Sequence, residues 1–342
     1  MIQTAPLDLR DPATFPSRRV ETWKYSDLRK FLRDAPPPSP SAPVPLWGGG
    51  PFEALGGEAM VFVNGRPVGA DTRRVCGEQA LRLRLISKAT GTGHSVSARV
   101  SARAGARVLL LETPEGEGSA YVAHNRLDID IAHDAEVTRV VLVDEPEDAL
   151  SVTQARVKVE PGARYRQTII ATGAKLQRFE TEVAHYARGA DVRLDGLYAL
   201  SGDRHADLTS VVTHMAADGQ TSQLTKGVVR DTARGVFQGK IVVERGADGT
   251  DARMAHNALI LSERGEIDAK PELIIYADDV QCAHGNTVGT LDESALFYMQ
   301  QRGLSAEEAR ALLTQAFLME VVDRIEHEGA REEVRAWLTE RS

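Results

Sequence analysis

The sequence predicts a mainly β protein, built as a β-solenoid of stacked coils with helical segments at both ends. Apolar and polar residues alternate through the middle of the chain, small turns recur there at a nearly constant spacing, and helical patterns are confined to the two ends. These observations together indicate coils of short strands. We expect a helical segment and linker over residues 1–51, a β-helix core over 52–291 and a helical domain over 292–342.

Composition and charge limit the class of protein. The chain has 342 residues, of which 42% are hydrophobic, and 41 basic against 49 acidic residues give a net charge of −8. A globally acidic chain is a poor candidate for unspecific nucleic-acid binding, because such binding needs a basic surface. Since no run of about 18 apolar residues occurs, we expect no membrane span.

The chain has two cysteines, Cys76 and Cys282, which are too few for a disulfide framework. Free thiols suit a reducing compartment. The first residues contain early acids and lack the apolar core of a secretory signal. We therefore expect a cytoplasmic protein.

The N-terminal part predicts a short amphipathic helix between Pro16 and Arg33, interrupted near Ser26, with Asp27 capping its second half. So short a helix is marginal alone and should dock on another part of the molecule. Residues 35–51 are rich in proline and glycine. This composition predicts a linker without helix or sheet between the helix and the main body.

The middle of the chain carries the repeat. Residues 59–68 predict a hairpin with an Asn64-Gly65 turn. Further turns begin at Gly105, Asp134, Gly162, Gly189, Gly219 and Gly246, at separations of 29, 28, 27, 30 and 27 residues. A spacing kept over so many turns indicates about seven or eight stacked coils, each of two or three strands, and argues against a β-sandwich.

A solenoid has an open sheet edge at each end, which either a helix or a partner must cover. Asp292 can cap a short helix that ends near Gly303, and Ser305 with Glu308 predicts a capping box that opens a long helix. A last helix is expected over residues 330–339. The apolar stripes of these two final helices could cover the solenoid end or present a groove to another subunit.

The stretch from Lys270 to Gln301 is the candidate site. Leu273 to Tyr276 predict a strand buried on both faces, and Cys282 and His284 follow at a predicted turn. This pair could contribute soft metal ligands, or it could be a small core residue and a satisfied turn histidine. His256 lies about one coil earlier, so we expect it to be a neighbour of the pair.

The number of cysteines constrains any metal role of this pair. Iron–sulfur clusters are usually held by four protein ligands, mostly thiolates, and the two cysteines of this chain are far apart in sequence. If Cys282 and His284 take part in a cluster, the remaining ligands must come from a second chain.

Two other functions stay open, although the sequence lacks the G-x-S-x-G, H-E-x-x-H and C-x-x-C motifs and we assign no catalytic residue. Asp128 and Asp130, or the adjacent Asp278 and Asp279, could serve a β-solenoid carbohydrate-active enzyme, although simple alternation also explains the first pair. A homodimeric metal-binding protein could join two Cys282/His284 pairs across a two-fold axis.

Two runs of sequence resemble the SufB/SufD family of iron–sulfur cluster assembly scaffolds. The first is ETWKYSDLRKFL, from Glu21 to Leu32, and the second is the longer stretch from Val236 to Val322. Within the second run, KPELIIYADDVQCAHGNTVG resembles the SufD branch, and LFYMQQRGLSAEEA is shared by both branches. SufB-like chains carry a cysteine where this chain has His256, which also favours the SufD branch.

The resemblance implies a right-handed parallel β-helix and a non-catalytic scaffold subunit of the SufBCD complex. It implies pairing with a SufB-like homologue through a β-helix edge and docking of a SufC-like ABC ATPase on the C-terminal helices, with a homodimer possible in isolation. His284, accompanied by Cys282, would face the partner's cluster-building cysteine. An iron–sulfur cluster would form transiently at that interface, and this chain alone would hold none.

Overall fold

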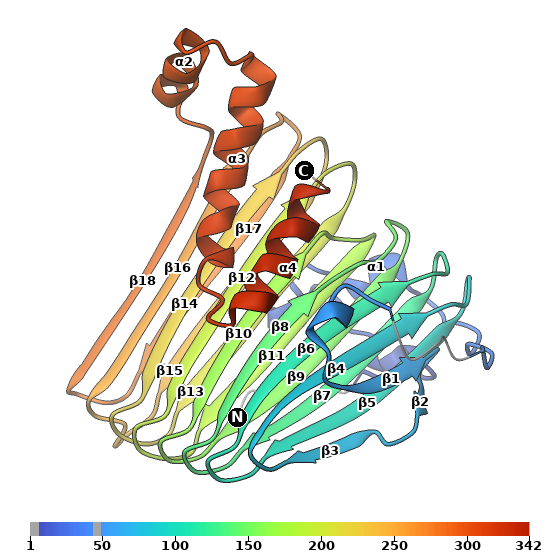
Figure 1. The fold of residues 1–342 in the computed structure, drawn as a ribbon, viewed down its shortest axis with the longest axis vertical. Coiled ribbons are helices and arrows are strands. Elements are labelled where there is room, and N and C mark those ends of the chain that lie inside the picture. The colour runs from blue at the N-terminus through green and yellow to red at the C-terminus, as the bar shows by residue number, and fades with distance from the viewer. Residues whose placement is uncertain (1–6, 44–48, 342) are drawn as a thin grey trace.

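Two parallel β-sheets wind through the middle of the chain and form the predicted solenoid (Figure 1). The computed structural model describes residues 7–43 and 49–341; residues 1–6 and 44–48 of the predicted N-terminal segment, and Ser342, lie outside the described residues. Within the described part, consecutive coil strands alternate between a ten-stranded and an eight-stranded sheet. The prediction of a parallel β-helix is therefore confirmed, with two strands in each coil.

The order of strands in each sheet follows the stacking of the coils. The ten-stranded sheet contains β18 (Val280–Gly289), β16 (Thr250–Ile260), β14 (Gln220–Val229), β12 (Asp191–Leu200), β10 (Arg164–Ala171), β8 (Glu136–Leu142), β6 (Arg107–Gly116), β4 (Glu78–Ser87), β1 (Glu58–Val63) and β2 (Arg66–Val68). The eight-stranded sheet contains β17 (Glu266–Ile275), β15 (Arg234–Val243), β13 (His205–His214), β11 (Leu176–His185), β9 (Leu150–Val159), β7 (Val122–Ile131), β5 (Gly93–Ala102) and β3 (Thr72–Val75). Neighbouring strands are parallel except in the predicted hairpin, where β1 and β2 are antiparallel.

Alternation and turn chemistry explain why this sequence coils. On β7 the apolar Leu127, Ile129 and Ile131 are buried between the sheets, while the residues between them face outward. At the corners, Gly105 and Asp134 have positive φ values of 70° and 53°. Such left-handed residues let the chain turn sharply into the next strand, which glycine and aspartate allow more readily than other residues.

The interior also contains buried charge, which alternation did not predict. Arg139 on β8 and Glu112 on β6 are fully buried, and a guanidinium nitrogen lies 2.8 Å from the carboxylate. Gln167 accepts a second hydrogen bond from Arg139, also at 2.8 Å. Because both charges are paired and hydrogen-bonded, they can be buried between the sheets.

The N-terminal segment docks on the eight-stranded sheet, as expected for so short a helix. It contains η1 (Pro12–Thr14), η2 (Glu21–Trp23) and α1 (Leu28–Phe31), and the predicted interruption near Ser26 separates the last two. Trp23 is buried, with the Arg178 guanidinium 4.3 Å from its ring centroid. Ser26 hydrogen-bonds Asp207. Asp27 precedes α1 without the predicted side-chain cap.

The predicted linker does more than connect this segment to the core. Pro38 forms an isolated parallel bridge with Gly93 on β5, so the expectation that residues 35–51 take no part in sheet pairing is wrong at this point. Two backbone bonds make the bridge: Ser39 donates to Gly93 and Gly93 donates to Pro37. A further short helix, η3 (Glu53–Leu55), precedes the first strand.

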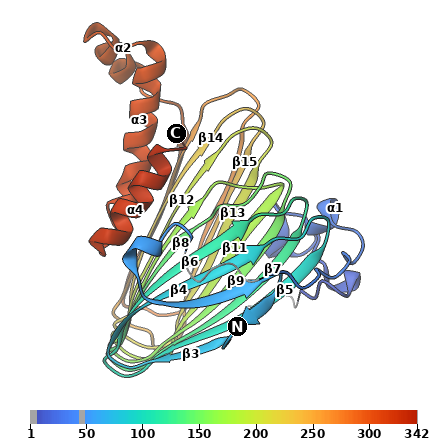
Figure 2. The ribbon, with the colours of Figure 1, turned by 45° about the vertical axis from the view of Figure 1, so that its right-hand side comes forward.

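The C-terminal helices are α2 (Glu293–Gln301), α3 (Ala306–Val322), which opens with the predicted capping box, and α4 (Glu328–Thr339). Of these, α3 and α4 lie on the outer face of the ten-stranded sheet, and α2 projects beyond it (Figures 1 and 2). Leu318, Val321 and Val322 of α3 belong to one buried cluster with apolar residues of β6, β8, β10, β12 and β14. The alternative that the two final helices cover the end of the solenoid is wrong, because α3 and α4 pack on the apolar outer face of those strands.

Candidate functional site at the C-terminal edge

Strands β17 and β18 form the last coil, and in the described part of the chain no strand pairs with their outer sides. Ile275 and Tyr276, at and just beyond the end of β17, are 41% and 55% exposed, and Val288 on β18 is 45% exposed. The prediction that Leu273 to Tyr276 are buried on both faces is therefore wrong for the single chain. An edge strand has a neighbour on one side only, and its unpaired backbone groups can bind a further strand.

Cys282 and His284 lie on β18, and not at a turn as predicted; the turn lies earlier, at Asp278 and Asp279. In the register of the sheet, Cys282 lies opposite Ala252 and His284 opposite Met254, both of which face the solenoid interior. Cys282 packs against this interior core, while His284 is exposed at the open end. The pair therefore occupies the inward side of an uncovered edge.

His256 is close to the pair but lies in register with Asn286, two residues beyond His284. Its ring is fully buried and stacks on Phe237, with ring centroids 4.7 Å apart. One ring nitrogen lies 2.9 Å from the Tyr198 hydroxyl and the other 2.7 Å from Oδ1 of Asn286. Burial lowers the pKa of His256 to about 4, so the ring is neutral at physiological pH. With both nitrogens bonded, it offers no free ligand atom.

At this edge the chain offers two candidate metal ligands, the Cys282 thiol and the His284 imidazole. Partial burial raises the pKa of the Cys282 thiol, so the thiol stays protonated until a metal or a cation favours the thiolate. Among the described residues, no group of three or more His, Cys, Asp or Glu side chains is placed to hold a metal ion. Cys282 and His284 could thus contribute only part of a coordination shell.

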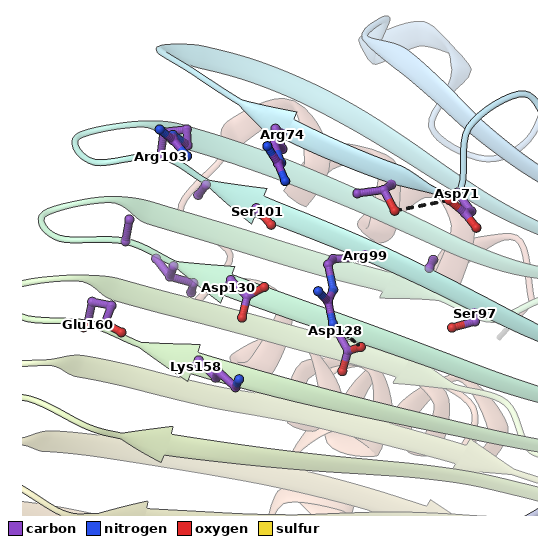
Figure 3. Close-up of a pocket in the computed structure, with 15 residues that line it drawn as sticks. Asp71, Arg74, Ser97, Arg99, Ser101, Arg103, Asp128, Asp130, Lys158 and Glu160 are labelled. Carbon is purple, nitrogen blue, oxygen red and sulfur yellow. Dashed lines mark hydrogen bonds and ion pairs between the residues drawn. The ribbon is translucent and has the colours of Figure 1, made fainter.

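The acidic residues of the alternative enzyme lie elsewhere. Asp128 and Asp130 line an open depression of about 640 Å³ on the outer face of the eight-stranded sheet (Figure 3). A nitrogen of Arg99 lies 3.2 Å from the Asp128 carboxylate, and Asp130 is in register with Lys158. Asp279 accepts a backbone hydrogen bond from Gly249 at the turn before β18. The two acidic pairs are therefore separate surface features, and the first lies within a ladder of compensating charges.

No helix of the described residues is long and apolar enough to cross a membrane.

The fold is thus a parallel β-helix whose last coil is unpaired in the described residues, with Cys282 and His284 on the inward side of that edge. The family model described as SUF system FeS cluster assembly, SufBD core domain matches residues 85–317. The chain belongs to this SufBD core family, which places it in the SUF system of iron–sulfur cluster assembly.

Individual relatives agree with this membership. The iron-sulfur cluster assembly protein SufD of Escherichia coli is 26% identical over 382 residues, covering 95% of this chain and 89% of its own. An iron-sulfur cluster assembly SufBD family protein of Synechocystis is 32% identical over 198 residues, covering 58% of this chain and 44% of its own length. SufD of Bacillus subtilis is 33% identical over 133 residues, which cover 39% of this chain and 30% of its own.

Proposed function

We propose that this chain is a SufD-like, non-catalytic scaffold subunit of a SufBCD complex, and that it pairs with a SufB-like homologue through the edge formed by β17 and β18. The observation that carries the proposal is the unpaired last coil. Both of its strands are ten residues long and expose apolar side chains at the rim. Addition of a partner's coil would satisfy the backbone groups and bury these side chains.

The inward side of this edge supports a shared site. Cys282 and His284 supply two ligands from one strand, and the partner chain would supply the others. The iron–sulfur cluster is the product assembled there and is passed on, so an incomplete ligand set in one chain is consistent with transient binding. Complex formation would bury Cys282 further, and iron would then compete with the proton for the thiolate.

The free part of the C-terminal helices fits a second partner, a SufC-like ATPase. The end of α3 is fixed to the sheet by its buried residues and by the chain that follows, where Arg324 hydrogen-bonds Asp195 at 2.9 Å. By contrast, α2 projects from the body (Figure 2) and exposes Phe297 and Tyr298 by 63% and 58%. Force applied to α2 by ATP-driven motion would reach the sheet through the anchored end of α3.

The exposed Cys76 and the partly buried Cys282 are both free thiols, and this supports a reducing, cytoplasmic compartment as part of the proposal. In isolation the same edge could pair with a second copy of the chain. The mass of the purified chain alone separates a homodimer from a monomer that waits for its SufB-like partner.

The test is co-expression with candidate SufB-like and SufC-like partners, followed by mass determination and anaerobic measurement of iron and sulfide. We expect a stable complex that carries a cluster. His284→Ala, alone or with Cys282→Ala, should leave the complex intact and reduce cluster yield by about tenfold or more. Arg253→Ala, one coil earlier and facing outward, is the matched control. A yield that His284→Ala leaves unchanged would remove this site from the function.

A further inference from the structure

A chain of hydrogen bonds runs from the solenoid interior to the proposed assembly site. Oδ1 of Asn286 lies 2.7 Å from Nδ1 of His256, and Nε2 of His256 lies 2.9 Å from the hydroxyl of Tyr198. An amide oxygen only accepts, so Nδ1 of His256 carries the proton and donates to it. Nε2 of a neutral ring is then an acceptor, and Tyr198 donates to it. Both hydrogen bonds therefore run in the same donor-to-acceptor direction, from Tyr198 to His256 and from His256 to Asn286.

This series of hydrogen bonds is held rigidly at its inner end, at Tyr198 and His256. Tyr198 and His256 are both fully buried, and the His256 ring is parallel to Phe237 within 4°. The space around Tyr198 is closed, since a Cβ at Gly227 or Gly235 would come within 2.3 Å of its ring. The imidazole is therefore packed on both sides, and its two hydrogen bonds set its tautomer.

Asn286 places the outer end of the chain beside His284. Both residues lie on β18, two positions apart, so their side chains leave the strand on the same side. Their Cα atoms are separated by about 7 Å along the strand. Because Oδ1 of Asn286 is turned inward to His256, its NH₂ group is left as a donor at the rim, uncommitted among the hydrogen bonds of the described residues.

We propose that Tyr198 and His256 are positioning residues that hold Asn286 with its NH₂ group directed at the sulfur ligands, sulfide or thiolate, of the cluster that assembles at Cys282 and His284. The proposal rests on the proposed function and adds a residue to its site. Donors to cluster sulfur stabilise the negative charge there and tune the potential, and groups that orient ligands commonly affect binding by 10–100-fold. His256 thus acts through Asn286 and not as a ligand.

The same two strands contain a matched control on their opposite face. Thr287 follows Asn286 and faces outward, where its hydroxyl donates to Oδ1 of Asn257 at 2.7 Å. This bond joins β16 and β18 at the same level, has the same length as the bond between His256 and Asn286, and points away from the site. A purely structural role for cross-strand bonds predicts equal effects of removing either one.

The first experiment is nitrogen NMR of the imidazoles in the chain without partners, with His256→Gln used to assign the signal. We expect His256 to be protonated at Nδ1 alone. Asn286→Asp keeps an acceptor and should keep this tautomer, whereas Asn286→Ala should release it into a mixture. An imidazole signal that Asn286→Ala leaves unchanged overturns the inference, whatever the assembly result.

The second experiment compares cluster yield and the cluster's visible spectrum in the co-expressed complex. Asn286→Ala and Asn286→Asp both lack the NH₂ group, and we expect each to lower the yield by about tenfold and to shift the spectrum of the residual cluster. Thr287→Val should match the unmodified complex. Equal behaviour of the Asn286 and Thr287 variants overturns the inference. Insensitivity to His284→Ala as well would instead refute the proposed function, while the tautomer result would stand.

Discussion

The two ends of the solenoid are built in opposite ways. At the N-terminal end, β2 is three residues long, runs antiparallel and contains Pro67, and β3 is four residues long with Arg73 and Arg74. At the C-terminal end, β17 and β18 are ten residues each and expose Ile275 and Val288. Short strands, proline and charge prevent edge pairing, and long apolar edges promote it. The N-terminal edge is therefore poorly suited to accept a further strand, and the C-terminal edge is well suited to it.

The largest expected effect is a difference in stability between variants of the interior and variants of the open edge. Phe237→Ala removes a fully buried ring and should lower the free energy of unfolding by about 3–5 kcal/mol. Tyr276→Ala, just beyond the end of β17, should change it by less than about 1 kcal/mol in the isolated chain because the ring is 55% exposed. Urea unfolding of both variants measures the difference. Equal losses would show that the edge is already part of the folded core.

The second prediction tests the edge itself. Ile275→Lys combined with Val288→Lys places two charges where a partner's coil would pack, and we expect the affinity for the SufB-like partner to fall by about 100-fold or more. Val68→Lys introduces a charge at the protected end, on β2, and should leave the affinity unchanged. Mass measurements over a dilution series report the dissociation constants. Weakening by the Val68 variant alone would reverse the assignment of the two ends.

The smallest expected effect is a difference between buried and exposed histidines in the pH dependence of stability. His185 and His214 stack in the interior with ring centroids 4.1 Å apart, and burial lowers the pKa of His214 from 6.5 to about 4. The unfolded chain therefore binds more protons below pH 6.5, so stability is complete above this pH and is lost as the pH falls toward 4. Between pH 7 and 5 this histidine should account for roughly 1–2 kcal/mol of lost stability.

His214→Gln should reduce that pH dependence, measured as the free energy of unfolding at pH 7 and pH 5. The matched control is His133→Gln, because the side chain of His133 is 64% exposed. A pH dependence that is the same in all three proteins would show that other groups cause the acid sensitivity.

Much of the fold follows from local patterns in the sequence. The turn spacing predicts the coils, and the Asn64-Gly65 dipeptide predicts the hairpin, where both residues have positive φ. The surface on which the C-terminal helices pack could not be predicted. An apolar stripe shows that a helix packs against something, but it does not identify the surface. The interior pair of Arg139 and Glu112 was missed for a similar reason, since charged residues on a strand normally indicate a solvent-facing side.

The candidate site was predicted in part. Sequence spacing correctly places His256 one coil before the stretch that contains Cys282, but the exact register puts it opposite Asn286. A shift of two residues along a strand changes which side chains meet, and the length of a turn decides it. The run from Leu273 to Tyr276 is apolar at every position, which predicts a strand buried on both faces. In the single chain these residues are partly or largely exposed. Pairing of this edge with a partner's coil, as proposed above, would account for the mismatch between sequence and structure.

The most direct test of the account is hydrogen–deuterium exchange of the chain alone and in the complex with its SufB-like partner. We predict that the backbone amides of β17 and β18 that point away from β15 and β16 exchange rapidly in the isolated chain and become protected in the complex, while those of β2 and β3 change little. Protection that appears at β2 and β3, with β17 and β18 still exchanging, would contradict the central claim that the C-terminal edge is the assembly face.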